Sequence, residues 1–255
     1  MFKKSKTKRI WKDTYKIHSY ESDFTGQATL ANLCQYMQES AWNHAENLQV
    51  GFSHLLKKDL IWVLSRQLVM IYKYPQWGDI IQVHTWPTGK DRLFCYRDFK
   101  IFDESNNIIG LASTTWFVID LKERKPQRTD SYIQLEVDGS VERVFPSFPA
   151  KIHPVKVPEF SHTLQVNYSD LDVNDHVNNV KYIEYVLDSL PLEFIKSHLL
   201  KGVEVNYIAE AQYGNKILIH HETKNNGSLE MLHDLFREED NMEICRARTV
   251  WEKKA

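Results

Sequence analysis

The sequence is poor in several features that mark large classes of proteins. Its 255 residues include only 9 glycines and 8 prolines, which excludes collagen-like and low-complexity chains. Its 32 basic and 34 acidic side chains leave a net charge of −2, so it lacks the overall positive charge typical of proteins that bind nucleic acids. No run of 18 apolar residues occurs, and we therefore expect neither a membrane-spanning helix nor a membrane partner.

Patterns that bind metals or cofactors are equally sparse. Cys34, Cys95 and Cys245 form an odd count with no C-x-x-C pair, which is typical of packing thiols in a reducing compartment. The histidines of the second half have neither H-x-x-x-H nor H-E-x-x-H spacing, and no glycine-rich or Walker phosphate loop occurs. We expect no metal and no cofactor.

What is present is an ordinary globular composition, with 42% hydrophobic and 26% charged residues. The length allows one large domain or two small ones. The basic stretch Lys3 to Arg9 is followed by Ile10-Trp-Lys rather than by a long apolar segment, so it is typical of a solvated tail and not of a signal peptide. We therefore expect a cytoplasmic protein.

The two halves of the chain resemble each other. The pentapeptide at 36–40 matches the one at 185–189, which lies 149 residues later, and Asp23 falls on Asp172 at the same offset. Residues 75–79 match 211–215 at an offset of 136, and 112–116 match 247–251 at 135. Three ordered matches indicate a tandem duplication, with about 13 extra residues near positions 45–60 of the first copy.

Each copy has the same predicted elements. A short strand (Thr14–Tyr20 or Phe160–Tyr168) leads into a polar turn and an amphipathic helix, and alternating strands follow. The apolar helix positions are Leu30, Leu33, Met37 and Ala41 in the first copy, and Val180, Ile183, Val186 and Leu190 in the second. This order predicts an α+β fold in which each long helix is wrapped by an antiparallel sheet. We place the domains at residues 1–129 and 160–255, joined by a proline-containing linker at 130–159.

The segment before the second helix carries the densest polar chemistry. Asp172, Asn174 and His176 alternate along an extended turn, so their side chains can point the same way. The helix is predicted to begin near Val177, with Asn178 or a neighbour as its cap. Its free N–H groups would then suit an oxyanion. An Asp/Asn-rich turn also serves as simple capping chemistry, so these residues alone leave both interpretations open.

The first copy favours the functional interpretation. Thr25 and Gln27 occupy the places of Asn174 and His176, so the turn folds without the amide and the imidazole. Glu210, near the end of a predicted strand, similarly has Tyr74 as its counterpart. The imidazole and the glutamate are therefore confined to the second copy, although a glutamate at a strand end can also be a plain surface residue.

Several longer motifs resemble those of plant and bacterial acyl-acyl-carrier-protein thioesterases. They are residues 39–44 (ESAWNH), 60–66 (LIWVLSR), 74–79 (YPQWGD) and above all 170–182 (DLDVNDHVNNVKY). The resemblance extends from about Tyr15 to Trp251. It implies two fused hotdog domains, an acyl-chain pocket in the first and a catalytic site in the second.

The resemblance also implies that Asp172, Asn174, His176 and Glu210 are the catalytic residues, and that water hydrolyses the thioester directly. Plant members carry a cysteine after the glutamate, where this chain has Ala211, so a Cys–His scheme cannot operate here. Plant members also carry a plastid transit peptide. This chain starts close to its first predicted strand, which favours a bacterial-type cytoplasmic enzyme.

The implied partner is an acidic acyl carrier protein, which a nearly neutral chain must meet with a local basic cluster. Two clusters qualify: Lys122, Arg124, Lys125 and Arg128 after a predicted strand, and the N-terminal Lys3 to Arg9. An acyl-CoA thioesterase and a non-catalytic acyl-binding protein are the alternatives, and a homodimer stays open. Trp62 and Leu64 join the apolar face of the first helix as candidates to line the acyl pocket.

Overall fold

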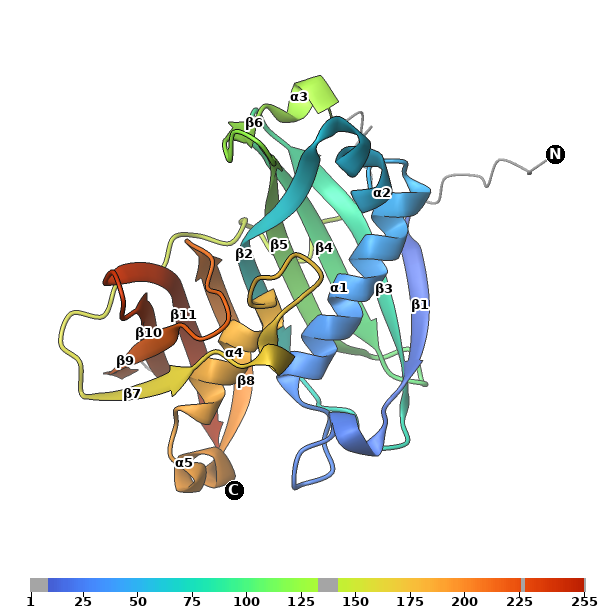
Figure 1. Ribbon diagram of the computed structural model, residues 1–255. Coiled ribbons are helices and arrows are strands. Elements are labelled where there is room, and N and C mark those ends of the chain that lie inside the picture. The colour runs from blue at the N-terminus through green and yellow to red at the C-terminus, as the bar shows by residue number, and fades with distance from the viewer. Residues whose placement is uncertain (1–8, 133–141, 226–227, 255) are drawn as a thin grey trace. The chain divides into compact units, whose positions relative to one another are not determined.

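The computed structural model describes residues 9–132, 142–225 and 228–254. The chain divides into two compact units, and in each a helix lies against an antiparallel sheet (Figure 1). The first unit comprises Met1–Leu64 and Tyr72–Phe148, and the second comprises Ser65–Ile71 and Pro149–Ala255. Within the described part of the chain, no helix is both long enough and apolar enough to cross a membrane.

The sheet of the first unit holds four long strands and, beside the last of them, the first half of β2 (Leu60–Ile71). In spatial order the four long strands are β1 (Trp11–Lys16), β3 (Ile80–Lys90), β4 (Phe94–Phe102) and β5 (Ile108–Asp120), all antiparallel, with the short β6 (Pro126–Gln127) paired to β5. Helix α1 (Leu30–Asn47) packs on β1 and β3. The short helices are α2 (Phe52–Leu55) and α3 (Thr129–Tyr132), with 3-10 turns at Ser19–Glu21 and Leu56–Lys58.

The second unit repeats this plan. The order is the second half of β2 (Leu60–Ile71), then β8 (His198–Tyr207), β11 (Met242–Lys253), β10 (Leu229–Arg237), β9 (Lys216–Asn225) and β7 (Phe160–Gln165), all antiparallel. Its helices are α4 (Asn179–Asp188) and α5 (Leu192–Ser197), with a 3-10 turn at Tyr168–Asp170. The second half of β2 thus belongs to this unit, where it pairs with β8.

The predicted apolar helix faces form the cores of the two units. Every one of the eight positions is buried: Leu30, Leu33, Met37, Ala41, Val180, Ile183, Val186 and Leu190. Burial of each of the larger side chains stabilises the fold by roughly 1.5–3 kcal/mol. The two predicted helices are therefore confirmed, as is the prediction that each packs against strands.

The first predicted strand of each copy ends earlier than expected. β1 ends at Lys16 and β7 at Gln165, and a 3-10 turn follows in both copies. In each copy, a carboxylate three residues later in the sequence accepts a hydrogen bond from the backbone N–H that would otherwise pair with the neighbouring strand. Glu21 Oε2 accepts from His18 N at 2.7 Å, and Asp170 Oδ2 accepts from Asn167 N at 2.7 Å.

The extra residues of the first copy lengthen its helix. Helix α1 has 18 residues and α4 has 10, and α2 follows α1 before β2 begins. The insertion therefore leaves the helix N-terminus, where the polar turn lies, in the same place in both copies.

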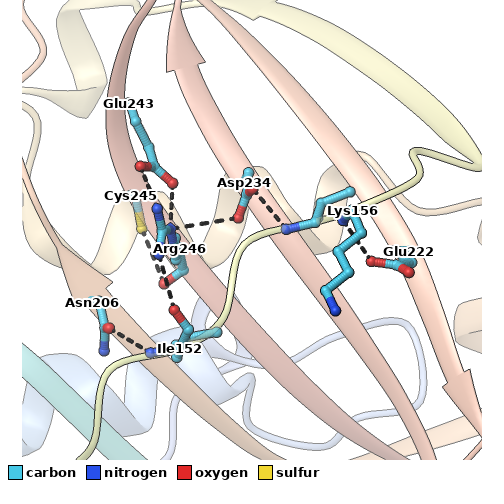
Figure 2. Close-up of polar contacts among 9 residues, drawn as sticks. Ile152, Lys156, Asn206, Glu222, Asp234, Glu243, Cys245 and Arg246 are labelled. Atoms are coloured by element: carbon cyan, nitrogen blue, oxygen red, sulfur yellow. Dashed lines mark hydrogen bonds and ion pairs between the residues drawn. The ribbon is translucent and has the colours of Figure 1, made fainter.

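Residues 149–159, which we call the strap, cross the second unit's sheet without forming a strand (Figure 2). Side chains of the sheet accept its backbone N–H groups: Ile152 N donates to Asn206 Oδ1 at 2.8 Å and Val155 N to Asp234 Oδ2 at 2.8 Å. In the first unit, Val144 N donates to Asp98 Oδ2 at 2.9 Å.

Candidate active site

The polar turn before α4 is built around Asp172. Its backbone N–H donates to the His176 carbonyl at 2.8 Å, and its own carbonyl accepts from Asp175 N at 3.1 Å. Its Oδ1 accepts the backbone N–H of Asn174 at 2.8 Å. Asp175 adopts a φ of 61°, in the left-handed region that closes a tight turn. The Asp172 carboxylate therefore fixes the turn that presents Asn174 and His176.

His176, on the turn before α4, contacts Glu210, on the loop that follows β8. His176 Nε2 lies 3.3 Å from Glu210 Oε2, and the two side chains are 22% and 38% exposed. The pair is thus open to a water molecule or a substrate while the protein restricts its motion. An imidazole beside a carboxylate can accept, hold and return a proton, which is what general acid–base chemistry requires.

The loop that carries Glu210 is bonded to the turn and to the core. Val177 N donates to the Ala211 carbonyl at 2.9 Å. Ala211 N donates to the hydroxyl of Tyr182 on α4 at 3.1 Å, and Arg237 Nη1 donates to the Glu210 carbonyl at 2.8 Å. The sequence motifs did not single out Tyr182 or Arg237 as site residues.

The first copy folds into the same turn without this chemistry. Asp23 N donates to the Gln27 carbonyl at 2.8 Å, and Gly26, with φ of 80°, donates to the Asp23 carbonyl at 2.9 Å. Asp23 Oδ1 accepts Thr25 N at 2.7 Å, as Asp172 accepts Asn174 N. Tyr74, at the place of Glu210, is buried. The turn therefore does not need His176 or Glu210 in order to fold.

The N-terminus of α4 is capped as the sequence predicts, by Asn178. Its Oδ1 accepts Val180 N at 2.9 Å and its carbonyl accepts Lys181 N at 2.9 Å, while its own N–H donates to Asp170. Three backbone donors at this helix end are therefore already in use. The side chain of Asn174, which is exposed on the turn, is better placed to meet a ligand than these N–H groups.

The cysteines pack as the sequence indicates. All three are free and buried, and burial raises the pKa of the Cys95 thiol to about 12 and that of Cys245 well above its usual range. Both thiols are thus disfavoured as nucleophiles, because the thiolate is the reactive form. In the described residues, no group of three His, Cys, Asp or Glu side chains could hold a metal ion.

The predicted pocket and docking residues lie on the first unit. Leu64 is buried and Trp62 is partly buried, with its indole N–H donating to the Val50 carbonyl at 2.8 Å. In the basic loop after β5, Lys122 pairs with Asp59 at 2.6 Å and Lys125 with Glu123 at 3.5 Å. Of the N-terminal cluster, Lys3 to Lys8 lie outside the described residues.

Known proteins match almost the whole chain. The family model for the acyl-ACP thioesterase N-terminal domain matches residues 8–135, and that for the C-terminal domain matches 154–253. An oleoyl-acyl carrier protein thioesterase of Arabidopsis thaliana is 32% identical, over 96% of this chain and 77% of its own length. A palmitoyl-acyl carrier protein thioesterase of Gossypium hirsutum is 32% identical, over 96% of this chain and 64% of its own. Both relatives are described as chloroplastic.

Solved structures agree. An acyl-ACP thioesterase from Bacteroides thetaiotaomicron has a TM-score of 0.81 at 27% identity, covering 96% of this chain and 98% of that one. The 12:0-ACP thioesterase of Umbellularia californica has a TM-score of 0.80 at 24% identity, covering 96% and 94%, and supports the fold alone. The expected α+β fold with tandem hotdog repeats is confirmed. On these matches and the two family models, the chain belongs to the acyl-acyl carrier protein thioesterase family.

Proposed function

We propose that this protein hydrolyses the thioester of fatty acyl-acyl carrier protein and releases a free fatty acid, which ends chain elongation. The observation that carries the proposal is the 3.3 Å contact between His176 and Glu210. His176 shares its turn with Asn174, and the first copy has Gln27 and Tyr74 in the places of His176 and Glu210. The relatives' names supply the substrate class.

In the proposed mechanism, the His176–Glu210 pair removes a proton from water as the water attacks the thioester carbonyl. Either Glu210 or His176 is the base, with the other group orienting it. The amide of Asn174 stabilises the tetrahedral oxyanion, and one such donor contributes roughly 3–4 kcal/mol. Asp172 acts indirectly, because its carboxylate holds the Asn174 backbone at 2.8 Å. The C–S bond then breaks and the thiol leaves with a proton, so a covalent nucleophile is not required.

The two copies divide the work in this proposal. Residues 160–255 carry the reaction, and residues 1–129 hold the acyl chain against the buried apolar face of α1. Residues 130–159 connect them, and the strap at the end of this segment is bonded to the second unit's sheet. The carrier protein is the partner, and nucleic acid and membrane are not. A cytoplasmic location and a homodimer stay predictions, which cell fractionation and sedimentation analysis would test.

The catalytic assignment is tested by single substitutions in the purified enzyme. His176→Ala, Asn174→Ala and Glu210→Gln should each lower kcat by at least about 10², the usual effect of removing one acid–base group or oxyanion donor. The matched controls are Gln27→Ala and Tyr74→Phe, at the equivalent positions of the first copy. If either control loses as much activity as the His176 variant, catalysis is not confined to the second copy.

The substrate class is tested by comparing kcat/KM for an acyl carrier protein and for CoA that bear the same acyl group. We expect the carrier protein to be preferred. A preference for CoA would move the protein to the acyl-CoA thioesterase alternative, and no cleavage of either substrate would support a non-catalytic acyl-binding role.

A further inference from the structure

The peptide that follows Glu210 is held by two residues that the sequence analysis did not assign to the site. The carbonyl of Glu210 accepts from Arg237 Nη1 at 2.8 Å. The next N–H, that of Ala211, donates to the Tyr182 hydroxyl at 3.1 Å. Ala211 is fully buried and Tyr182 is 3% exposed, so water cannot easily replace the Tyr182 hydroxyl. The peptide that joins Glu210 to Ala211 is thus fixed by one donor and one acceptor.

Arg237 is itself immobilised. Its Nε and Nη2 atoms donate to the two carboxylate oxygens of Asp240 at 3.0 and 2.6 Å. Paired bonds of this kind fix the plane of a guanidinium group. The third nitrogen, Nη1, donates to the Glu210 carbonyl. Arg237 is the last residue of β10, so the loop is bonded to the end of this strand through a side chain whose orientation is fixed.

The first copy shows what the fold alone requires at these positions. At the duplication's offset of 149, Leu33 stands in the place of Tyr182, and it is fully buried. Strand pairing places Asp103 at the position of Arg237, because Gln82 pairs with Phe102 as its counterpart Leu218 pairs with Phe236. An ionised carboxylate cannot donate a hydrogen bond as a guanidinium does. Pro75 stands in the place of Ala211 and has no N–H to donate. Where the loop carries Tyr74 instead of Glu210, the N–H donor, the hydroxyl and the guanidinium are absent together.

We propose that Tyr182 and Arg237 are positioning residues that hold the Glu210 carboxylate at its distance from His176. The inference rests on the proposed function, because it gives these residues a purpose only if Glu210 takes part in hydrolysis. Neither residue needs to touch the substrate. Each acts through the loop backbone, and a shift of about 1 Å in a reacting group can reduce the rate by about 10².

The test uses Tyr182→Phe and Arg237→Met in the full-length protein, assayed with acyl carrier protein substrate. We expect kcat to fall at least about tenfold while KM changes less than twofold, since the loop bears on the chemical step. Arg237→Lys, which keeps a donor but loses the paired contact with Asp240, should be intermediate. Thermal unfolding of each variant shows that the protein is folded.

Two residues serve as matched controls. Arg246 makes the same pattern of contacts elsewhere: it pairs with Glu243, three residues before it, and its Nη1 donates to the Ile152 carbonyl of the strap at 3.1 Å (Figure 2). Tyr185 is a second buried tyrosine of α4, with its ring against that of Tyr182. Arg246→Met and Tyr185→Phe should keep kcat within about twofold of the unsubstituted protein, since neither bonds to the Glu210 loop. Equal losses in the Arg237 and Arg246 variants would overturn the proposal.

A double substitution separates this inference from the proposed function. If Arg237 acts through Glu210, then adding Arg237→Met to Glu210→Gln should lower kcat by less than twofold further, because residues that act as one unit are not additive. A full additional tenfold loss would contradict the positioning role. If instead Glu210→Gln alone keeps normal activity, it is the proposed role of Glu210 that fails. If Glu210→Gln is inactive while Tyr182→Phe and Arg237→Met are normal, only the positioning role fails.

Discussion

The buried histidine pair of the second unit should make the protein sensitive to mild acid. His221 Nδ1 lies 2.8 Å from His233 Nδ1, and His233 Nε2 lies 2.8 Å from Thr249 Oγ1. All three residues are fully buried. Among the residues that the structure describes, His221 Nε2 has no hydrogen-bond partner, so a proton added there would create a buried, unpaired N–H group. Burial, together with the nearby His162 and His220, lowers the pKa of His221 to about 4.

The direction of the effect follows from proton linkage. The histidine of the unfolded chain has a pKa near 6.5. Below pH 6.5 the unfolded state binds a proton that the folded state does not bind. The free energy of unfolding therefore decreases as the pH is lowered, until the pH passes below the pKa of the folded state. For His221 alone the loss between pH 7 and pH 5 amounts to about 2 kcal/mol, and it reaches about 3 kcal/mol below pH 4.

The measurement is urea unfolding at pH 7, 6 and 5, for the unsubstituted protein and for His221→Gln. The variant is less stable at pH 7, because it disturbs the core, but its deficit should shrink by about 2 kcal/mol at pH 5. The control is His153→Gln, an exposed histidine of the strap, which should leave the difference in stability between pH 7 and pH 5 unchanged. A deficit for His221→Gln that is the same at all three pH values would refute the reasoning.

Two further predictions concern the partner and the acyl chain. Reversal of Arg124 and Lys125 to Glu should raise KM for acyl carrier protein several-fold, and the effect should weaken with added salt because the Debye length is about 8 Å at physiological ionic strength. Turnover of a small soluble acyl thioester should be unchanged, and equal losses on both substrates would mean that these charges support the fold. Met37→Ala, which removes a buried side chain from α1, should shift product release toward longer fatty acids, each added methylene contributing about 0.8 kcal/mol of burial. If the variant only loses the roughly 2–5 kcal/mol of stability typical of a core truncation, with an unchanged product profile, Met37 is ordinary core.

The sequence by itself determined the features that depend on local chemistry. Helical spacing located the buried faces of α1 and α4, because a period of 3.6 residues places those positions on one side. Asn178 was identifiable as a helix cap because its oxygen needs only the nearby Val180 N–H. The internal repeat was visible because both copies keep the same turn residues, such as Asp23 and Asp172. The repeat also marked Gln27 and Tyr74 as controls within the same chain.

Only the tertiary structure decided which distant residues meet. His176 and Glu210 are separated in sequence by two helices and a whole strand, so their contact depends on how the loop after β8 packs against the turn. The second half of β2 joined the second unit through pairing with β8, and the strap bonded to acidic side chains that project from a sheet face. Tyr182 and Arg237 became visible only as backbone partners of the Glu210 loop. Such contacts are set by strand register and side-chain direction across long chain separations, and no local pattern of residues records them.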